Sequence, residues 1–231
     1  VDDIVGWNFI DDNNLPWDTD GHGTMVAGII GAQTANGVGI AGINPYARIM
    51  ALRALDGHGK GRASHTAEAI VYAVNNGAQV INLSLGGRGM TQAETLAIEF
   101  ANSRAVLVVA AAGNEAIELT DWGPVTAPGV LAVGATDADN VRIPASNWGK
   151  RIDLMAPGID VVSLRSPGTD LMAKFENQTP LEHVVGADHA YYRASGTSFA
   201  APIVTGVASL IKQQNPARTP AEIRRMLTNS A

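Results

Sequence analysis

The chain has 231 residues, of which 46% are hydrophobic and 16% are charged, and its formal net charge is -6. This length and composition fit one folded domain with a buried sheet, not a disordered chain. The acidic balance argues against a nucleic-acid surface, and no apolar run approaches the roughly 18 residues of a membrane span. The absence of cysteine excludes disulfides, a thiol nucleophile and thiolate metal sites.

Short apolar runs rich in β-branched residues alternate with longer segments of helical periodicity. Strands are expected in five ranges bounded by glycine, proline, asparagine or aspartate: 47–55, 78–85, 105–112, 129–136 and 151–157. This alternation is typical of βαβ units, in which helices cover both faces of a mostly parallel sheet. We predict an α/β fold of three layers, formed by a single domain over residues 1–231.

Apolar residues at three- and four-residue spacing predict four helices, over 64–76, 91–102, 198–214 and 219–227. In the first helix one face is formed by Ala67, Ile70, Val71 and Val74, and Gly77 follows as a C-cap. In the last, Thr219 is the expected N-cap and Pro220 the first helical residue. The polar stretch from 163 to 193 has no clear period and is expected to form a long surface loop or hairpin.

Ser198 stands in the motif GTSFAAP, at the start of the longest predicted helix. A serine at a helix start has a free backbone N–H and lies at the positive end of the helix dipole. It can therefore attack a carbonyl and help to hold the oxyanion that forms. Taken alone, the motif favours Thr197 and Ser198 as ordinary N-cap residues, which is the commoner use of these residue types.

Two further motifs carry groups suited to the same chemistry. His22 lies between two glycines that leave space around the imidazole, as a general base that meets substrate requires. Asn114 follows Gly113 at the end of a predicted strand, where its amide can donate to an oxyanion. Each motif also has a routine interpretation, a histidine in a turn and a Gly-Asn turn.

Taken together, the ordered motifs GHGT, INLSLGG, VVAAAGNE and SGTSFAAP resemble the subtilisin-like serine peptidases, over nearly the whole chain. The resemblance implies a subtilisin-like fold and a serine endopeptidase that forms an acyl-enzyme at Ser198. It implies that His22 acts as general base and then acid, and that Asn114 and the Ser198 N–H form the oxyanion hole. An α/β hydrolase is disfavoured, because that fold places its serine before its histidine.

The same resemblance implies that a peptide substrate lies as an added strand between two edges. One edge is formed by Ser84, Leu85, Gly86 and Gly87, and the other by Gly59, Lys60 and Gly61. Ala112 and Gly113 are expected to line the pocket for the residue before the scissile bond.

Trp122 falls near the floor of that pocket. It would favour small side chains if it points inward, and a surface position in a loop is the alternative.

The chain departs from the family in the position of the catalytic aspartate. The family's aspartate ends a core strand some tens of residues before the histidine, whereas only 21 residues precede His22. Asp18 and Asp20 match the loop that leads to the histidine, so we assign no triad aspartate within the chain. We expect the acid and its strand upstream of Val1 or on a separate segment, and we expect the domain to be incomplete at both ends. The alternative function is an inactive, peptidase-like module that binds or scaffolds.

The chemistry requires no cofactor, and no metal ligands are assigned. The turn over residues 33–42 resembles the family's carbonyl-rich calcium loop, so a structural calcium ion is a candidate. The expected partners are a peptide or protein substrate and a propeptide or separate N-terminal segment. By resemblance alone, the location is extracellular or periplasmic.

Overall fold

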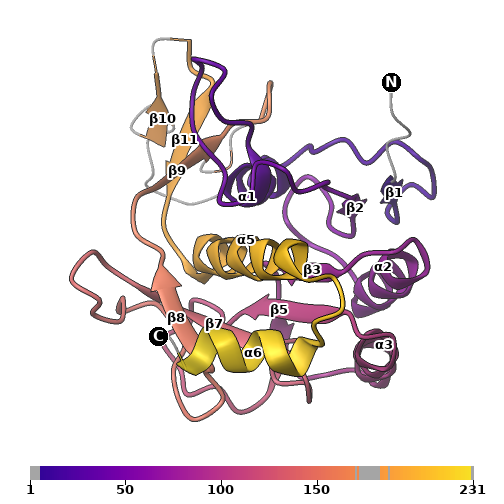
Figure 1. Cartoon of the computed structure of the whole chain (residues 1–231). Helices are drawn as coiled ribbons and strands as arrows, with labels where there is room; N and C mark the ends of the chain where they lie inside the picture. Colours follow the sequence, from indigo (N-terminus) through magenta and orange to yellow (C-terminus); the bar gives the residue numbers. More distant parts are fainter. Residues whose placement is uncertain (1–5, 170, 172–182, 187, 230–231) are drawn as a thin grey trace.

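The computed structural model describes residues 6–169, 171, 183–186 and 188–229. Its main sheet has four parallel strands in the order β3-β5-β7-β8 (Figure 1). Their bounds are Val80–Leu83 for β3, Leu107–Ala111 for β5, Leu131–Thr136 for β7 and Leu154–Pro157 for β8. All residues of β5 and β7 are buried. Their continuous apolar sequences are those of strands covered on both faces.

Helices cover both faces of this sheet, as the sequence predicted. Figure 1 shows α2 (Ala63–Asn75) and α3 (Gln92–Ser103) side by side, apart from α5 (Thr197–Gln214) and α6 (Pro220–Asn229). Alternate residues of β5 point to the two layers. Val108 packs with the α2 and α3 side chains, whereas Val109 packs with those of α5 and α6. A further helix, α1 (His22–Gly31), packs against α5.

The remaining strands form three small sheets. A parallel pair is formed by β1 (Gly6–Asn8) and β2 (Ala51–Arg53), and an antiparallel pair by β4 (Gly87–Arg88) and β6 (Trp122–Gly123). The third sheet, in the order β10-β11-β9, is antiparallel. Its strands are β9 (Val161–Leu164), β10 (Val184–Val185) and β11 (Tyr191–Ala194). Within the described residues, β2 pairs with β1 and β3 with β5, so the two sheets are not joined.

Most sequence-predicted elements are present, with shorter strands. The run 47–55 forms a strand over Ala51–Arg53 alone, and Val71, assigned to the buried face of α2, is 36% exposed. The predicted cap at Thr219 forms a capping box with Glu222, and the structure adds a second box in which Thr91 precedes α3 and pairs with Glu94. The stretch 163–193 includes part of the β9-β11 hairpin, but residues 170, 172–182 and 187 lie outside the described ranges. No described helix is both long and apolar enough to cross a membrane.

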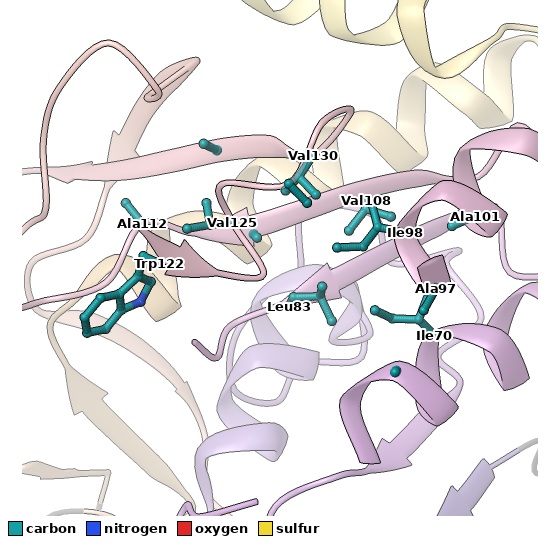
Figure 2. Close-up of a cluster of buried hydrophobic side chains, with 14 of the residues drawn as sticks. Ile70, Leu83, Ala97, Ile98, Ala101, Val108, Ala112, Trp122, Val125 and Val130 are labelled. Carbon is teal, nitrogen blue, oxygen red and sulfur yellow. The ribbon is translucent and has the colours of Figure 1, made fainter. Parts of the chain in front are cut away.

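The layer formed by α2 and α3 is anchored by one large buried cluster (Figure 2). Ile98 of α3 is fully buried in it, whereas Leu96 on the same helix is 56% exposed. We expect Ile98→Ala to lower the free energy of unfolding by about 2–5 kcal/mol, because it leaves a cavity in a close-packed core. Leu96→Ala is the matched control and should change the stability by less than about 0.5 kcal/mol. Urea denaturation of the two variants measures both values, and equal losses would contradict the packing described.

Candidate active site

The start of α5 is joined to the end of β5 by two hydrogen bonds. The Thr197 N–H donates to Asn114 Oδ1 at 2.8 Å, and the Gly113 N–H donates to Thr197 Oγ1 at 3.1 Å. Gly196 precedes the helix with φ 142°, and a Cβ placed on it would lie 3.2 Å from Asn114 Oδ1. Only glycine fits this position without strain. Ser198, the second residue of the helix, is thereby held beside the Asn114 amide.

The amide of Asn114 is oriented by its bond to the helix. Because Oδ1 accepts from the backbone of α5, the group left to donate to a bound molecule is Nδ2. Asn114 is exposed, so this donor can reach a substrate. Its neighbour, the backbone N–H of Ser198, belongs to the first turn of α5 and lacks a partner within the helix. The two donors are those that the sequence proposed for an oxyanion.

Asn147 fixes the loop that follows Asn114. It is fully buried, and its Oδ1 accepts from the backbone N–H groups of Glu115 and Ile117 at 3.0 and 3.1 Å. Its Nδ2 donates to Ala112 O and to Glu115 Oε2, both at 2.9 Å. Sequence reasoning missed this residue, because an asparagine in an irregular segment has no periodic signal. Its role is evident only from the four bonds that meet there.

Ser84 connects β3 to the same helix start. Its Oγ donates to Ser198 O at 2.7 Å, and the Ser198 hydroxyl makes a long contact of 3.4 Å with Ser84 O. Asn82 Nδ2 donates to Ser84 Oγ, and Thr205 Oγ1 donates to Asn82 Oδ1. This chain of polar side chains fixes the end of β3 against α5. Asn82 and Thr205 were not singled out in the sequence, because they are distant from each other along it.

His22 is placed at the same site by packing. Its ring lies against that of Phe199, which directly follows Ser198, with 5.6 Å between the ring centroids. Phe199 is 4% exposed and shares a buried cluster with Met25 of α1. The packing of α1 against α5 therefore brings the imidazole and the hydroxyl to one side of the molecule. Both residues line the same cleft.

Asp18 holds the start of α1. Its Oδ2 accepts from both the N–H and the hydroxyl of Thr24, and its Oδ1 accepts from the N–H groups of Gly21 and Asp20. Burial by itself raises the pKa of this carboxyl. The hydrogen bond from the Thr24 hydroxyl and then those from the backbone outweigh burial, so the pKa lies below its ordinary value of 3.8. Its four bonds support the turn interpretation given to this aspartate.

A cleft of about 2630 Å³ brings the predicted site residues together. Its lining includes all of the sequence-predicted site residues except Ala112, namely His22, Gly59, Lys60, Gly61, Ser84, Leu85, Gly86, Gly87, Gly113, Asn114 and Ser198. Ala112 is not among these lining residues, and its side chain is fully buried in the cluster that also holds Trp122 and Val125. Its part in the pocket stays a prediction.

The turn over residues 33–42 is the segment for which the sequence suggested calcium. Asn36 Oδ1 already accepts from the Val38 N–H, and the Tyr191 hydroxyl lies against Gly39. Among the described residues, no three side chains of His, Cys, Asp or Glu gather in a way that could hold a metal ion. Backbone carbonyls are the donors that this turn could supply. Calcium here stays a prediction.

Comparison with known proteins agrees with this geometry. A family model described as the subtilase family matches residues 1–231, and the chain belongs to that family. It is 40% identical over 228 residues to a thermophilic serine proteinase of Bacillus sp. (strain AK1), covering 99% of the chain but 51% of that relative. It is 37% identical over 226 residues to subtilisin BL of Lederbergia lenta, covering 98% of the chain and 76% of the relative.

Solved structures agree on the fold. A cold adapted subtilisin-like serine proteinase matches with a TM-score of 0.82 and 31% identity, covering 98% of this chain and 74% of that one. A protease from Pseudoalteromonas arctica PAMC 21717 matches with a TM-score of 0.79 and 34% identity, covering 91% and 63%. The fold is therefore the subtilisin-like α/β fold. The chain spans between half and about three quarters of the relatives named here.

The carboxylate of Asp18 should contribute to stability in a pH-dependent way. We expect Asp18→Ala to lower the free energy of unfolding at pH 7 by about 1–2 kcal/mol, the range for a lost N-terminal cap. Because the folded pKa is lowered, this contribution is complete above 3.8 and is lost as the pH falls through the folded pKa. The difference from the parent chain should therefore shrink below pH 3.8.

Thermal melts from pH 7 downward measure this effect, with Asp139→Ala as the control for loss of an exposed aspartate. A loss of stability for Asp18→Ala that stays constant with pH would contradict the role of its charge.

Proposed function

We propose that this chain forms most of a serine endopeptidase domain, which hydrolyses peptide bonds through an acyl-enzyme at Ser198. The observation that carries the proposal is the convergence of Ser198, Asn114 and His22 on one cleft. Membership of the subtilase family supports it, and the named relatives are serine proteinases and subtilisins. The same membership supports a location outside the cytoplasm.

Each group is proposed to have one task. Ser198 Oγ attacks the substrate carbonyl, and the His22 imidazole takes the hydroxyl proton. Asn114 Nδ2 and the Ser198 N–H donate to the oxyanion of the tetrahedral intermediate. His22 then gives its proton to the leaving amine, which departs and leaves the acyl group on Ser198. Water attacks that ester with the help of His22, which frees the acid product and restores the hydroxyl.

Substrate binding is assigned to the walls of the same cleft. Gly86 and Gly87 follow the end of β3, and Gly59 to Gly61 follow the end of β2. The turn at Gly61 is tight, because a Cβ there would lie 2.4 Å from Ala54 O. Glycines let a peptide backbone approach both edges closely, as strand addition requires. The proposed substrate is therefore an extended segment of a peptide or protein.

An acid for His22 is proposed to arrive on an additional strand. β2 and β3 both line the cleft, and their inner edges are unpaired within the described chain. All but one of the β3 residues are half-buried, whereas β5 and β7 are buried throughout. Such an edge is a template for a further strand.

The cleft favours a strand that is apolar on both faces. Val26 and Ile30 of α1 and Ile70 and Ala73 of α2 line it next to the two strands. The carboxyl ends of parallel strands meet at one edge of a sheet, and the carboxyl end of β3 leads to Ser84. An aspartate at the carboxyl end of the added strand would therefore reach the edge where His22 lies. That strand is the proposed upstream or separate N-terminal segment.

A second candidate function is a peptide-binding module without turnover. It is favoured by the engagement of Asp18 in four hydrogen bonds at the start of α1, which leaves this nearby carboxylate committed to a structural role. The fold, the cleft and the strand-accepting edges are common to both functions. Chemistry at Ser198 separates them.

Complementation by a strand peptide tests the endopeptidase. The probe is a synthetic peptide of five β-branched apolar residues followed by Asp-Thr-Gly, and its matched control ends in Asn-Thr-Gly. Both peptides should bind, and the Asp peptide should raise kcat on casein by about 3 × 10⁴ over the Asn peptide. This magnitude is taken over from the family, in which loss of the aspartate has that effect. Ser198→Ala should abolish the gain and also labelling by a fluorophosphonate.

Two results would contradict the proposal. One is peptide binding without labelling of Ser198, which leaves the binding module. The other is activity of Ser198→Ala equal to that of the parent chain, which moves the chemistry elsewhere.

A further inference from the structure

Trp122 is a large side chain at the edge of the substrate cleft that the proposed mechanism does not use. It lines the cleft but is only 7% exposed. Figure 2 shows it beside Ala112 at one end of the buried cluster, away from Ile70 and Ile98. The indole is therefore packed from below by the core and borders the cleft above. The inward position that the sequence left open is the one observed.

The indole nitrogen lies between the two glycine segments assigned to substrate binding. A Cβ placed on Gly86 would be 2.8 Å from Trp122 Nε1 and 3.2 Å from its Cδ1. A Cβ placed on Gly113 would be 3.1 Å from the same Nε1. These glycines belong to the two walls of the proposed pocket for the residue before the scissile bond. Ring atoms of Trp122 thus lie directly against both glycine segments.

The backbone of Trp122 is held in place. Trp122 lies in β6, opposite Arg88 of β4, and the Gly89 N–H donates to Asp121 O. Trp122 O accepts from both the N–H and the hydroxyl of Thr126. Moving the ring out of the pocket would require a new rotamer in a close-packed cluster, which is costly.

The opposite side of the pocket is also narrow. A Cβ on Gly113 would lie 2.5 Å from Asn147 Nδ2 and 2.6 Å from Glu115 Oε2. These two atoms are bonded to each other at 2.9 Å, and Asn147 is fully buried. The space next to Gly113 is therefore bounded by three fixed polar atoms, counting the indole nitrogen. These atoms leave no room for a side chain on residue 113 itself and form one fixed wall of the proposed pocket.

We propose that Trp122 is a specificity-determining residue, which limits the residue before the scissile bond to glycine, alanine or serine. The inference rests on the proposed function, because it names the substrate class of that site. The limit is steric, since the indole and the two glycine segments leave a shallow pocket. The indole N–H borders both glycine segments and is a donor that a serine hydroxyl could meet.

Two peptide substrates test the proposal, succinyl-Ala-Ala-Pro-Ala and succinyl-Ala-Ala-Pro-Phe anilides. They are assayed with the chain complemented by the Asp-Thr-Gly strand peptide. The Ala substrate should have a kcat/KM about tenfold or more above that of the Phe substrate. Trp122→Gly should raise kcat/KM for the Phe substrate by about tenfold or more, because the vacated ring volume admits the phenyl group. Trp148→Gly, which removes a half-exposed indole outside the cleft, is the matched control and should leave the ratio unchanged.

A binding measurement keeps the test independent of turnover and of the folding of Trp122→Gly. Titration calorimetry on Ser198→Ala compares the product acids of the two substrates, and the Ala peptide should bind about tenfold more tightly. A preference for Phe in turnover or in binding, or a ratio that Trp122→Gly leaves unchanged, overturns the proposal while the peptidase stands. Preferential binding of the Ala peptide without any labelling of Ser198 supports the size limit set by Trp122 and contradicts the proposed catalysis. Binding of neither peptide, with no turnover, overturns both.

Discussion

The site depends on the pair of hydrogen bonds that joins the end of β5 to the start of α5. The Thr197 N–H and hydroxyl are bonded to Asn114 and Gly113, so a strand end and a helix start are fixed to each other by one residue. This arrangement uses an unpaired N–H of the first helical turn to orient a side-chain amide. Gly196 makes the close approach possible, because any Cβ would crowd Asn114. Asn147 and Ser84 then extend the same fixed arrangement to both walls of the cleft.

The second constraint on the structure is the open cleft between β2 and β3, whose facing edges have no strand between them among the described residues. A parallel sheet is stable when both faces and all inner edges are covered, and here the apolar sides of α1 and α2 border an unpaired stretch. Packing of α1 against α5 still places His22 beside Phe199. The positions of Ser198, His22 and Asn114 therefore rest on contacts within the chain. The acid is the component that the additional strand is proposed to bring.

The sequence predicted what depends on local patterns. The α/β alternation, the buried strands β5 and β7, and the cap at Thr219 follow from periodicity and from residue types at helix ends. Ordered motifs placed His22, Asn114 and Ser198, and the structure brings them to one cleft. Bonds between distant segments were not predictable, as for Asn147, which meets four partners in a loop without a period. The burial of the Ala112 side chain was not predictable either, because adjacency to Gly113 does not determine which way a side chain points.

Trp122 connects the core to the proposed specificity of the site. Its ring packs in the cluster that holds α2 and α3 on the sheet, and its nitrogen borders the pocket between Gly86 and Gly113. A smaller residue here would enlarge the pocket and at the same time remove buried apolar surface, so pocket size and stability are coupled at this position. The indole also requires glycine at positions 86 and 113, because a Cβ on either residue would meet the ring. The breadth of substrates that such a cleft accepts is then set by how tightly its core is packed.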